Sequence, residues 1–438
     1  MPPDVSDNHG DPGPAREDAL AVVRRLREAG HVAYFAGGCV RDMLLGLPPK
    51  DYDVATDAPP DRVRGLFTRT QAVGAAFGVI LVKQRKSQVE VATFRTDLEY
   101  RDGRRPEGVR FATAEEDAQR RDFTINGLFL DPIENRVIDY VGGQEDLKNK
   151  VLRAIGDADE RFGEDHLRLL RAIRFAARFG LTIDSATDEA IARNAPHLVR
   201  ISPERIAEEL RTMLTAPTRA LAWQTMRRYA LDGVIFRFLR GPTPAAHPGV
   251  AGGRPAFFER VSPGTRIPFG LALSAAAVEH LLVRLKDLSD WPDLSVRQTV
   301  RAMRQSLRIS NEEAEEMEGT LYGVEQLLRD ANPRVAALKR FLARPTAPLS
   351  RALLAALPSN LAVYREEQEQ RLAELEKTDY APPPLITGDD LTAAGLSPGP
   401  LFKRVLDEVY DAQLEGRVAA KEEALRLALA IASRPPAT

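Results

Sequence analysis

The twenty residues Phe35–Val54, FAGGCVRDMLLGLPPKDYDV, constrain the fold of this chain more than any other stretch. The apolar run AYFA at 33–36 predicts a strand, which leads into the glycine pair Gly37–Gly38 and then a helical turn. After a Leu-Pro-Pro turn comes Asp51-Tyr52-Asp53-Val54, which alternates as a strand does. Residues two apart in a strand share a face, so the carboxylates of Asp51 and Asp53 are expected to point the same way.

The residue types in this stretch fit phosphate and metal chemistry. Glycine lets a backbone approach a phosphate closely. Two adjacent carboxylates repel each other unless a positive charge lies between them, and a hard divalent cation is the usual solution. A lone Asp-x-Asp is more often a turn or a solvated strand edge, and a lone Gly-Gly is usually a turn. Their combination, with Arg41 between them, favours a phosphoryl-transfer site.

Length and composition set broad limits. The chain has 438 residues, too many for one core, so two to four domains are expected. No apolar run approaches membrane-spanning length, and the single cysteine, Cys39, excludes an internal disulfide and fits a reducing cytoplasm. The net charge of −2 does not indicate nucleic-acid binding. Residues 161–240, however, hold 14 Arg against 9 Asp and Glu, which fits either an RNA-binding surface or a solvated helical face.

Strand patterns lie before Gly143, and helical periodicity dominates after it. The sequence therefore predicts an α+β fold, with a small mixed β-sheet followed by helices. One predicted strand, VEVATF at 89–94, carries an acidic residue, Glu90, in an otherwise apolar alternation. Glu90 either faces solvent on an edge or, if its strand lies beside Asp51 and Asp53, adds a third carboxylate to the metal site.

The segment EDHLRLLRAIRFAARFG at 164–180 predicts one helix with an apolar stripe and an arginine stripe. The arginines are Arg168, Arg171, Arg174 and Arg178. The plain interpretation is an amphipathic surface helix. Asp165 and Arg168, three residues apart, could instead present an acceptor and a donor together. That pair matches the amino group and ring nitrogen of cytosine or adenine and mismatches guanine and uracil, which is costly in a dry site.

Several of these motifs together resemble those of the class II, bacterial-type tRNA nucleotidyltransferases, the CCA-adding enzymes, and their poly(A) polymerase relatives. The Gly-Gly…Asp-x-Asp stretch, RRDFTIN at 120–126, the Asp-x-x-Gly-Gly turn at 139–143 and Glu-Asp-x-x-Arg at 164–168 carry the resemblance. It implies template-independent nucleotidyl transfer to an RNA 3′ end, with tRNA as acceptor, CTP and ATP as substrates and Mg²⁺ as cofactor.

The resemblance also implies roles for individual residues. Asp51 and Asp53 would hold two Mg²⁺ ions, and Glu90 would complete the catalytic carboxylates. Gly38, Arg41 and Arg121 would hold the triphosphate. Asp165 and Arg168 would read the base, while Arg171 and Arg174 would line the nucleotide site.

The expected organisation is a disordered lead-in over 1–15, a nucleotidyltransferase head over 16–145, a helical neck over 146–240, a helical body over 241–380 and a tRNA-binding helical tail over 381–438. Cytoplasmic location, no membrane and no obligate protein partner are expected. The arginine-bearing loop Arg95–Arg110 favours full CCA addition over CC-only addition, and Ala75-Ala76 weakly disfavours poly(A) tailing. A-only addition and a catalytically inactive tRNA-binding protein are also compatible with these motifs.

Overall fold

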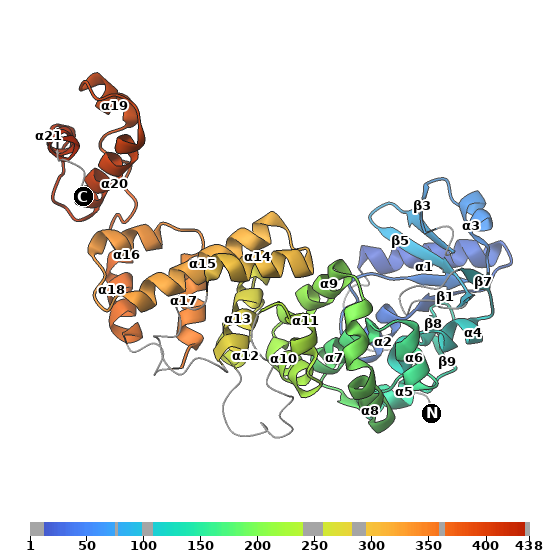
Figure 1. Ribbon diagram of the computed structural model, residues 1–438. Helices are drawn as coiled ribbons and strands as arrows, with labels where there is room; N and C mark the ends of the chain where they lie inside the picture. The colour runs from blue at the N-terminus through green and yellow to red at the C-terminus, as the bar shows by residue number, and fades with distance from the viewer. Residues whose placement is uncertain are drawn as a thin grey trace. The chain divides into compact units, whose positions relative to one another are not determined.

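The structure, a computed structural model, describes residues 13–74, 78–98, 108–239, 257–282, 295–358 and 364–433. The chain divides into two compact units, Met1–Gly252 and Gly253–Thr438 (Figure 1). A sheet lies in the first unit, and the described part of the second unit is helical. The predicted α+β class, with a mixed sheet in the N-terminal head, is thereby confirmed. No described helix is both long enough and apolar enough to cross a bilayer.

The head is built on a seven-stranded sheet with the order β3-β4-β5-β2-β1-β8-β9. Its strands are β1 (Ala33–Ala36), β2 (Val54–Thr56), β3 (Thr70–Gly74), β4 (Val79–Lys83), β5 (Gln88–Thr93), β8 (Leu128–Asp131) and β9 (Arg136–Asp139). The sheet is mixed, because β2 runs parallel to β5 while the other neighbours pair antiparallel. A separate antiparallel hairpin joins β6 (Arg95–Asp97) to β7 (Val109–Phe111).

Helix α1 (Pro14–Glu28) packs on this sheet, with contacts to β1, β2 and β5 (Figure 1). Its buried residues are Ala19, Val22, Val23 and Leu26, the spacing of one helical face. The remaining short elements of the head are α2 (Gly38–Leu44), α3 (Pro60–Leu66), α4 (Ala114–Gln119), the 3₁₀ helix η2 (Thr124–Asn126) and α5 (Gly143–Lys148). The segment that follows Asp122 therefore forms only a single 3₁₀ turn.

The loop before α5 is fixed by one carboxylate and one glycine. Asp139 accepts hydrogen bonds from the backbone N–H groups of residues 141 to 144 at 2.9–3.1 Å, which ties down the helix N-terminus. A Cβ on Gly143 would lie only 2.2 Å from the carbonyl oxygen of Thr124. The backbone of η2 and that of α5 thus meet where only a glycine fits.

We expect Gly143→Ala to lower the free energy of unfolding by about 3 kcal/mol, because the obstructing atom is backbone and cannot move aside alone. Gly65→Ala in α3 is the matched control, since a Cβ there meets nothing within 4 Å and alanine favours a helix by up to about 1 kcal/mol. Urea unfolding of both variants measures the difference. Equal stabilities of the two variants would contradict the packing argument.

Helices complete the first unit. They are α6 (Ala158–Glu164), α7 (Arg168–Phe179), α8 (Ser185–Asn194), the 3₁₀ helix η3 (Ala195–Arg200), α9 (Pro203–Leu214), α10 (Arg219–Arg228) and α11 (Leu231–Ile235). Two sequence predictions are wrong here. Strands do continue after Gly143, because β10 (Val151–Leu152) pairs in parallel with β11 (Thr182–Ile183). The helix predicted over 164–180 is broken at Asp165, whose backbone is extended at φ −148° and ψ 103°.

The second unit contains α12 (Phe257–Arg260), α13 (Phe269–Leu282), α14 (Val296–Leu307), α15 (Asn311–Arg329), α16 (Val335–Leu342), α17 (Ala347–Ala356), α18 (Arg365–Glu376), α19 (Gly388–Ala393), α20 (Pro400–Leu414) and α21 (Lys421–Ala432). Helix α15 packs against α13, α14 and α17. The last three helices share a small apolar core that includes Leu391, Val405 and Ala424. The finer division into head, neck, body and tail stays a prediction.

Candidate functional site

Three carboxylates influence one another electrostatically where β2 begins beside β5. Asp53 directly precedes β2, where its carbonyl oxygen accepts a hydrogen bond from Ala36 N–H at 3.0 Å. Val54 pairs with Val91, so the preceding residues, Asp53 and Glu90, are neighbours across the ladder. The strand of Glu90 thus lies beside Asp53, as the interpretation of Glu90 as a third carboxylate requires, and its role in a metal site stays a prediction. The expectation that Asp51 and Asp53 lie within a strand is wrong, because β2 begins at Val54.

The electrostatics of this cluster favour a bound cation. Partial burial, and then the negative charges of Glu90 and Asp51, raise the pKa of Asp53 to about 7, against the opposing effect of Arg121. Oxygen donors alone are the ligand type that Mg²⁺ prefers. Among the described residues, no three acidic, His or Cys side chains are arranged to enclose an ion by themselves. An ion here would need further oxygen ligands from water or substrate.

The glycine turn supports Arg121. Gly37 has φ +68°, and a Cβ there would lie 2.7 Å from Nη1 of Arg121. The Arg121 guanidinium donates to Asp117 at 3.0 Å and to the carbonyl oxygen of Asn126 at 3.2 Å, and lies over the ring of Phe129. It keeps 20% of its side-chain surface exposed. Arg121 is thus fixed in direction yet accessible to an anion.

Arg41 has a different environment. It is buried and donates to Asp42 at 2.6 Å and to the side-chain oxygen of Asn126 at 2.5 Å. Its guanidinium also lies 4.5 Å from the ring centroid of Phe179 on α7. The predicted triphosphate contact of Arg41 stays a prediction. The bond to Asn126 joins α2 to η2, and the contact with the Phe179 ring joins α2 to α7. Gly38 is the first residue of α2, directly beside this network.

Asp165 and Arg168 flank the break between α6 and α7, and each has its own partner. The Asp165 carboxylate accepts two hydrogen bonds from Arg205 on α9, at 3.1 and 2.6 Å. Arg168 opens α7 and donates to the Glu164 carboxylate and, at 2.7 Å, to the carbonyl oxygen of Arg161. The two residues therefore lie at the same helix joint, where the Arg168 backbone N–H donates to the Asp165 carbonyl oxygen at 3.0 Å, and each side chain is held in place by other groups.

The arginine stripe of α7 is neutralised inside the protein. Arg171 donates to Asp122 at 2.8 Å, and Arg174 donates to Glu209 at 2.7 Å. Arg178, the most exposed of the three, lies 3.4 Å from the Asp42 carboxylate. Because Asp42 and Asp122 belong to the head, these ion pairs hold α7 against it. The predicted nucleotide-lining roles of Arg171 and Arg174 stay predictions.

Asp122 makes stability depend on acid pH. Its carboxylate is buried, yet Arg171 and the Asn126 amide lower its pKa to about 2. A folded pKa below the unfolded value of about 3.9 contributes stability at neutral pH that is lost as the pH falls from about 4 toward 2. We expect Asp122→Asn to lower the free energy of unfolding by about 2 kcal/mol at pH 7, with the difference vanishing near pH 2.

Urea unfolding of wild type and Asp122→Asn at several pH values measures this dependence. Asp61→Asn is the control, because its side chain is 98% exposed. A difference that stays the same at every pH would contradict the assignment.

Sequence reasoning missed Arg205, Glu209 and Asp122 as partners of the predicted site residues. Arg205 and Glu209 lie in SPERIAEEL, which reads as an ordinary capped helix. Only the register of α9 against α7 brings its charges to this joint. The remaining signal is the arginine excess itself, which indicates that acidic partners are needed.

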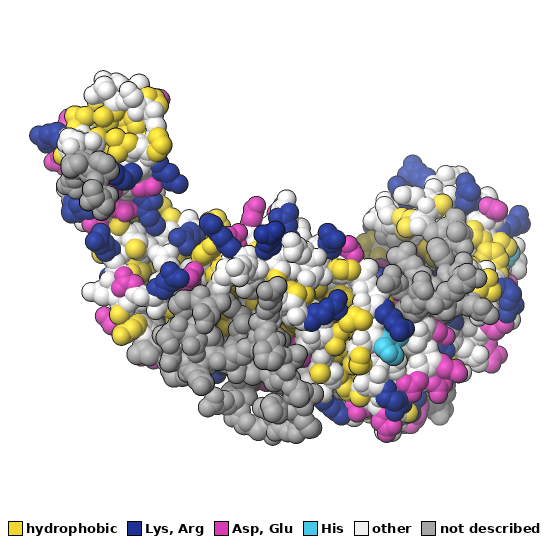
Figure 2. All heavy atoms as spheres, in the orientation of Figure 1, with side chains coloured by type: hydrophobic (Ala, Val, Ile, Leu, Met, Phe, Trp, Pro, Cys, Tyr) yellow, Lys and Arg dark blue, Asp and Glu magenta, His cyan; other side chains and the backbone are white. Residues whose placement is uncertain are grey.

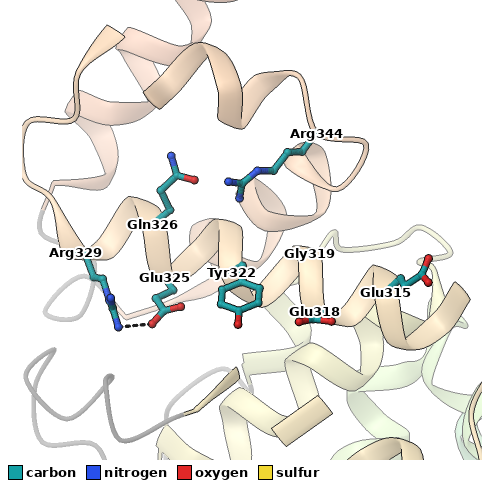
Figure 3. A pocket seen from close by; sticks show the side chains of 8 residues that line it. All are labelled: Glu315, Glu318, Gly319, Tyr322, Glu325, Gln326, Arg329 and Arg344. Carbon is teal, nitrogen blue, oxygen red and sulfur yellow. Dashed lines mark ion pairs between the residues drawn. The ribbon is translucent and has the colours of Figure 1, made fainter. Parts of the chain in front are cut away.

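An open pocket of about 690 Å³ lies on α15 in the second unit (Figure 3). It is lined by Glu315, Glu318, Gly319, Tyr322, Glu325, Gln326, Arg329 and Arg344. Arg329 pairs with Glu325 at 2.6 Å. With three glutamates against two arginines, this pocket does not suit a phosphate ligand, and none of the predicted site residues lines it.

Two family models match parts of the first unit. Residues 33–153 match the family described as poly A polymerase head domain. Residues 180–240 match the family described as probable RNA and SrmB-binding site of polymerase A. The fold and the site thus define a nucleotidyltransferase of the poly(A) polymerase type.

Similarity over the whole chain identifies the family more specifically. A CCA-adding enzyme of Geobacillus kaustophilus is 33% identical over 423 residues, covering 94% of this chain and 95% of that protein. One from Geobacillus thermodenitrificans is 45% identical over 210 residues, where the matched part spans about half of each protein, 48% and 52%. The crystal structure of a Bacillus stearothermophilus CCA-adding enzyme in complex with CTP superposes with a TM-score of 0.70 at 29% identity, covering 94% and 97%. The chain belongs to the family of CCA-adding enzymes.

Proposed function

We propose that this protein adds C and A nucleotides to the 3′ end of tRNA, using CTP and ATP and releasing pyrophosphate. The observation that carries the proposal is that the acidic residues and the Asp165–Arg168 pair lie in the same compact unit. Asp51 and Asp53 lie just before β2, and Glu90 lies on the neighbouring strand β5. The Asp165–Arg168 pair lies where α7 begins, and α7 is ion-paired to the head. The CTP complex of the B. stearothermophilus relative supports a nucleotide substrate.

Enzymes of this family generally use a divalent metal. We assign Asp51 and Asp53 as ligands of Mg²⁺, which lowers the pKa of a ribose hydroxyl and balances charge on pyrophosphate when it is bound. Glu90 adds negative charge that strengthens cation binding. Arg121, held over the glycine turn, is placed to bind triphosphate oxygens through charge-assisted hydrogen bonds.

Base selection is assigned to the helix joint. Asp165 would accept from the exocyclic amino group of cytosine or adenine, and Arg168 would donate to the ring nitrogen. Arg205 holds the carboxylate and Glu164 holds the guanidinium, so both groups have a fixed geometry, which supports this assignment. A guanine or uracil would leave both protein groups without a matching partner.

The extent of addition separates the possible activities. The loop that favours CCA over CC-only addition spans Arg95–Arg110, and its residues 99–107 lie outside the described structure, as do Ala75 and Ala76. Its ends form the β6–β7 hairpin. A-only or CC-only addition, poly(A) tailing and tRNA binding without catalysis are the competing activities. The predicted cytoplasmic location likewise stays a prediction.

One assay separates these activities. Transcripts of tRNA lacking CCA, CA or A are each incubated with CTP, ATP or both, and the products are sequenced. We expect full CCA from the shortest acceptor and no extension beyond it. Extension of only one of the acceptors would indicate partial addition, and long A tracts would indicate a poly(A) polymerase. Binding without pyrophosphate release would contradict an enzymatic role.

A further inference from the structure

Helix α14 in the second unit has one apolar face and one arginine face. Its buried residues are Val296, Thr299, Val300, Met303 and Leu307. The opposite side carries Arg297, Arg301, Arg304 and the C-terminal cap residue Arg308, all exposed. Spacings of four, three and four residues place these four side chains along one line, about 16 Å long. We call this set the α14 arginine stripe.

No acidic residue lies within this stripe along the sequence, where the nearest are Asp293, outside the described residues, and Glu312 in α15. Among the described residues, the structure gives Arg297, Arg301 and Arg308 no ion pair, and Arg304 donates to the neutral side chain of Asn311. Figure 2 shows Lys and Arg side chains along the surface where α14 lies. Four like charges at helical neighbour spacing repel one another.

The contrast with α7 is informative, because the two helices carry arginines at the same kind of spacing. In α7 these arginines have Glu164, Asp122, Glu209 and Asp42 as partners. In α14 the stripe faces solvent instead.

Arg308 adds a second observation. It has φ +53°, the left-handed helix-cap conformation in which glycine is strain-free and other residues cost about 1 kcal/mol. An arginine at this position extends the line of charge where glycine would fit the backbone better.

We propose that the α14 arginine stripe binds the phosphate backbone of the tRNA substrate through charge, without reading its bases. Guanidinium groups pair well with phosphate oxygens, and a line of exposed arginines complements a line of phosphates. Glutamines at positions 298 and 305 flank the stripe with further polar groups. The stripe lies outside residues 180–240, the region that matches an RNA-binding family. This inference rests on the proposed function, because it takes tRNA as the acceptor.

The test compares two variants with the same change in net charge. The first is Arg297→Gln/Arg301→Gln/Arg304→Gln/Arg308→Gln. The control is Arg24→Gln/Arg25→Gln/Arg62→Gln/Arg64→Gln, which removes four exposed arginines from head helices α1 and α3. Two ion pairs in this set, Arg25–Glu28 at 3.7 Å and Arg64–Asp61 at 3.8 Å, are surface pairs of little energetic weight. Circular dichroism and thermal melting establish that both variants fold.

Fluorescence anisotropy measures the binding of tRNA lacking CCA at increasing KCl concentration. Each lost phosphate contact makes the negative slope of log K against log salt less steep by about 0.7–0.9. We therefore expect the slope of the stripe variant to be less steep than that of wild type by about 3. We expect the control to keep the wild-type slope. At saturating tRNA, the rate of C addition should stay within about twofold of wild type, because the assigned reacting groups lie in the other unit.

A folded stripe variant with the wild-type slope would overturn the inference. The α14 arginine stripe would then serve solubility or bind a protein partner. An equal loss in the control would overturn it as well, because net charge would then explain the change. A wild-type protein that neither binds nor extends tRNA would overturn the proposed function itself.

Discussion

Replacing both metal-site carboxylates, Asp51→Ala/Asp53→Ala, is expected to lower the rate of C addition at least about 10³-fold, because several kcal/mol of charge stabilisation at the reacting phosphate would be lost. Binding of tRNA should change little, since these residues are acidic and would only repel phosphates. The measurement is single-turnover incorporation of CTP into tRNA lacking CCA, with Mg²⁺ varied. Incorporation by this variant at nearly the wild-type rate would exclude Asp51 and Asp53 as metal ligands.

Asp61→Asn serves as the matched control for this variant. Asp61 lies in the head on α3, and its side chain is 98% exposed. We expect wild-type rates and an unchanged Mg²⁺ dependence. A loss of activity in this control would show that general charge in the head, rather than the cluster beside β2, controls the rate.

Asp165→Ala should lower the efficiency of CTP and ATP incorporation by about 10²-fold, because the amino group of either base would lose its acceptor while Arg205 and Arg168 keep their charge. Incorporation of UTP and GTP should fall less, so the preference for C and A narrows. Competition assays with paired nucleotides give this ratio directly. A uniform loss for all four nucleotides would point to a structural role for Asp165 instead.

Two further variants make that result specific. Arg205→Gln leaves Asp165 in place but removes the cation that holds it, so a smaller loss of about 10-fold in the same selectivity is expected. Glu189→Gln on α8 is the control, since this side chain is 69% exposed and pairs with Arg193 on the same helix. It should leave selectivity unchanged.

The sequence supported the sheet and its carboxylates because their signals are local. The alternation of VEVATF predicted β5, and the apolar run before Gly37 predicted β1. The parallel pairing of β2 with β5 could not be predicted in this way, because it depends on long-range hydrogen bonds. The alternation of Asp51 and Asp53 also placed the start of the strand too early.

The helix around Asp165 shows a different limit. Between Asp165 and Gly180 no glycine or proline interrupts the helical periodicity, so nothing local predicts the break. The extended residue is stabilised by the hydrogen bond that its side chain accepts from Leu167 N–H and by the Arg205 guanidinium, which comes from α9, about forty positions further along the chain. Tertiary charge pairing thus overrides local helix propensity at this position.

The contacts of Asp122 and its neighbour determine where the chain can be truncated without loss of stability. It accepts from Arg171, which lies beyond residue 145, and the ring of the next residue, Phe123, packs edge-on against Phe175 of α7. A fragment truncated after residue 145 would lose that cation and leave the aromatic ring to water. The sheet and α7 are therefore expected to fold together within the first unit, and we expect a fragment truncated after residue 145 to be less stable than that unit.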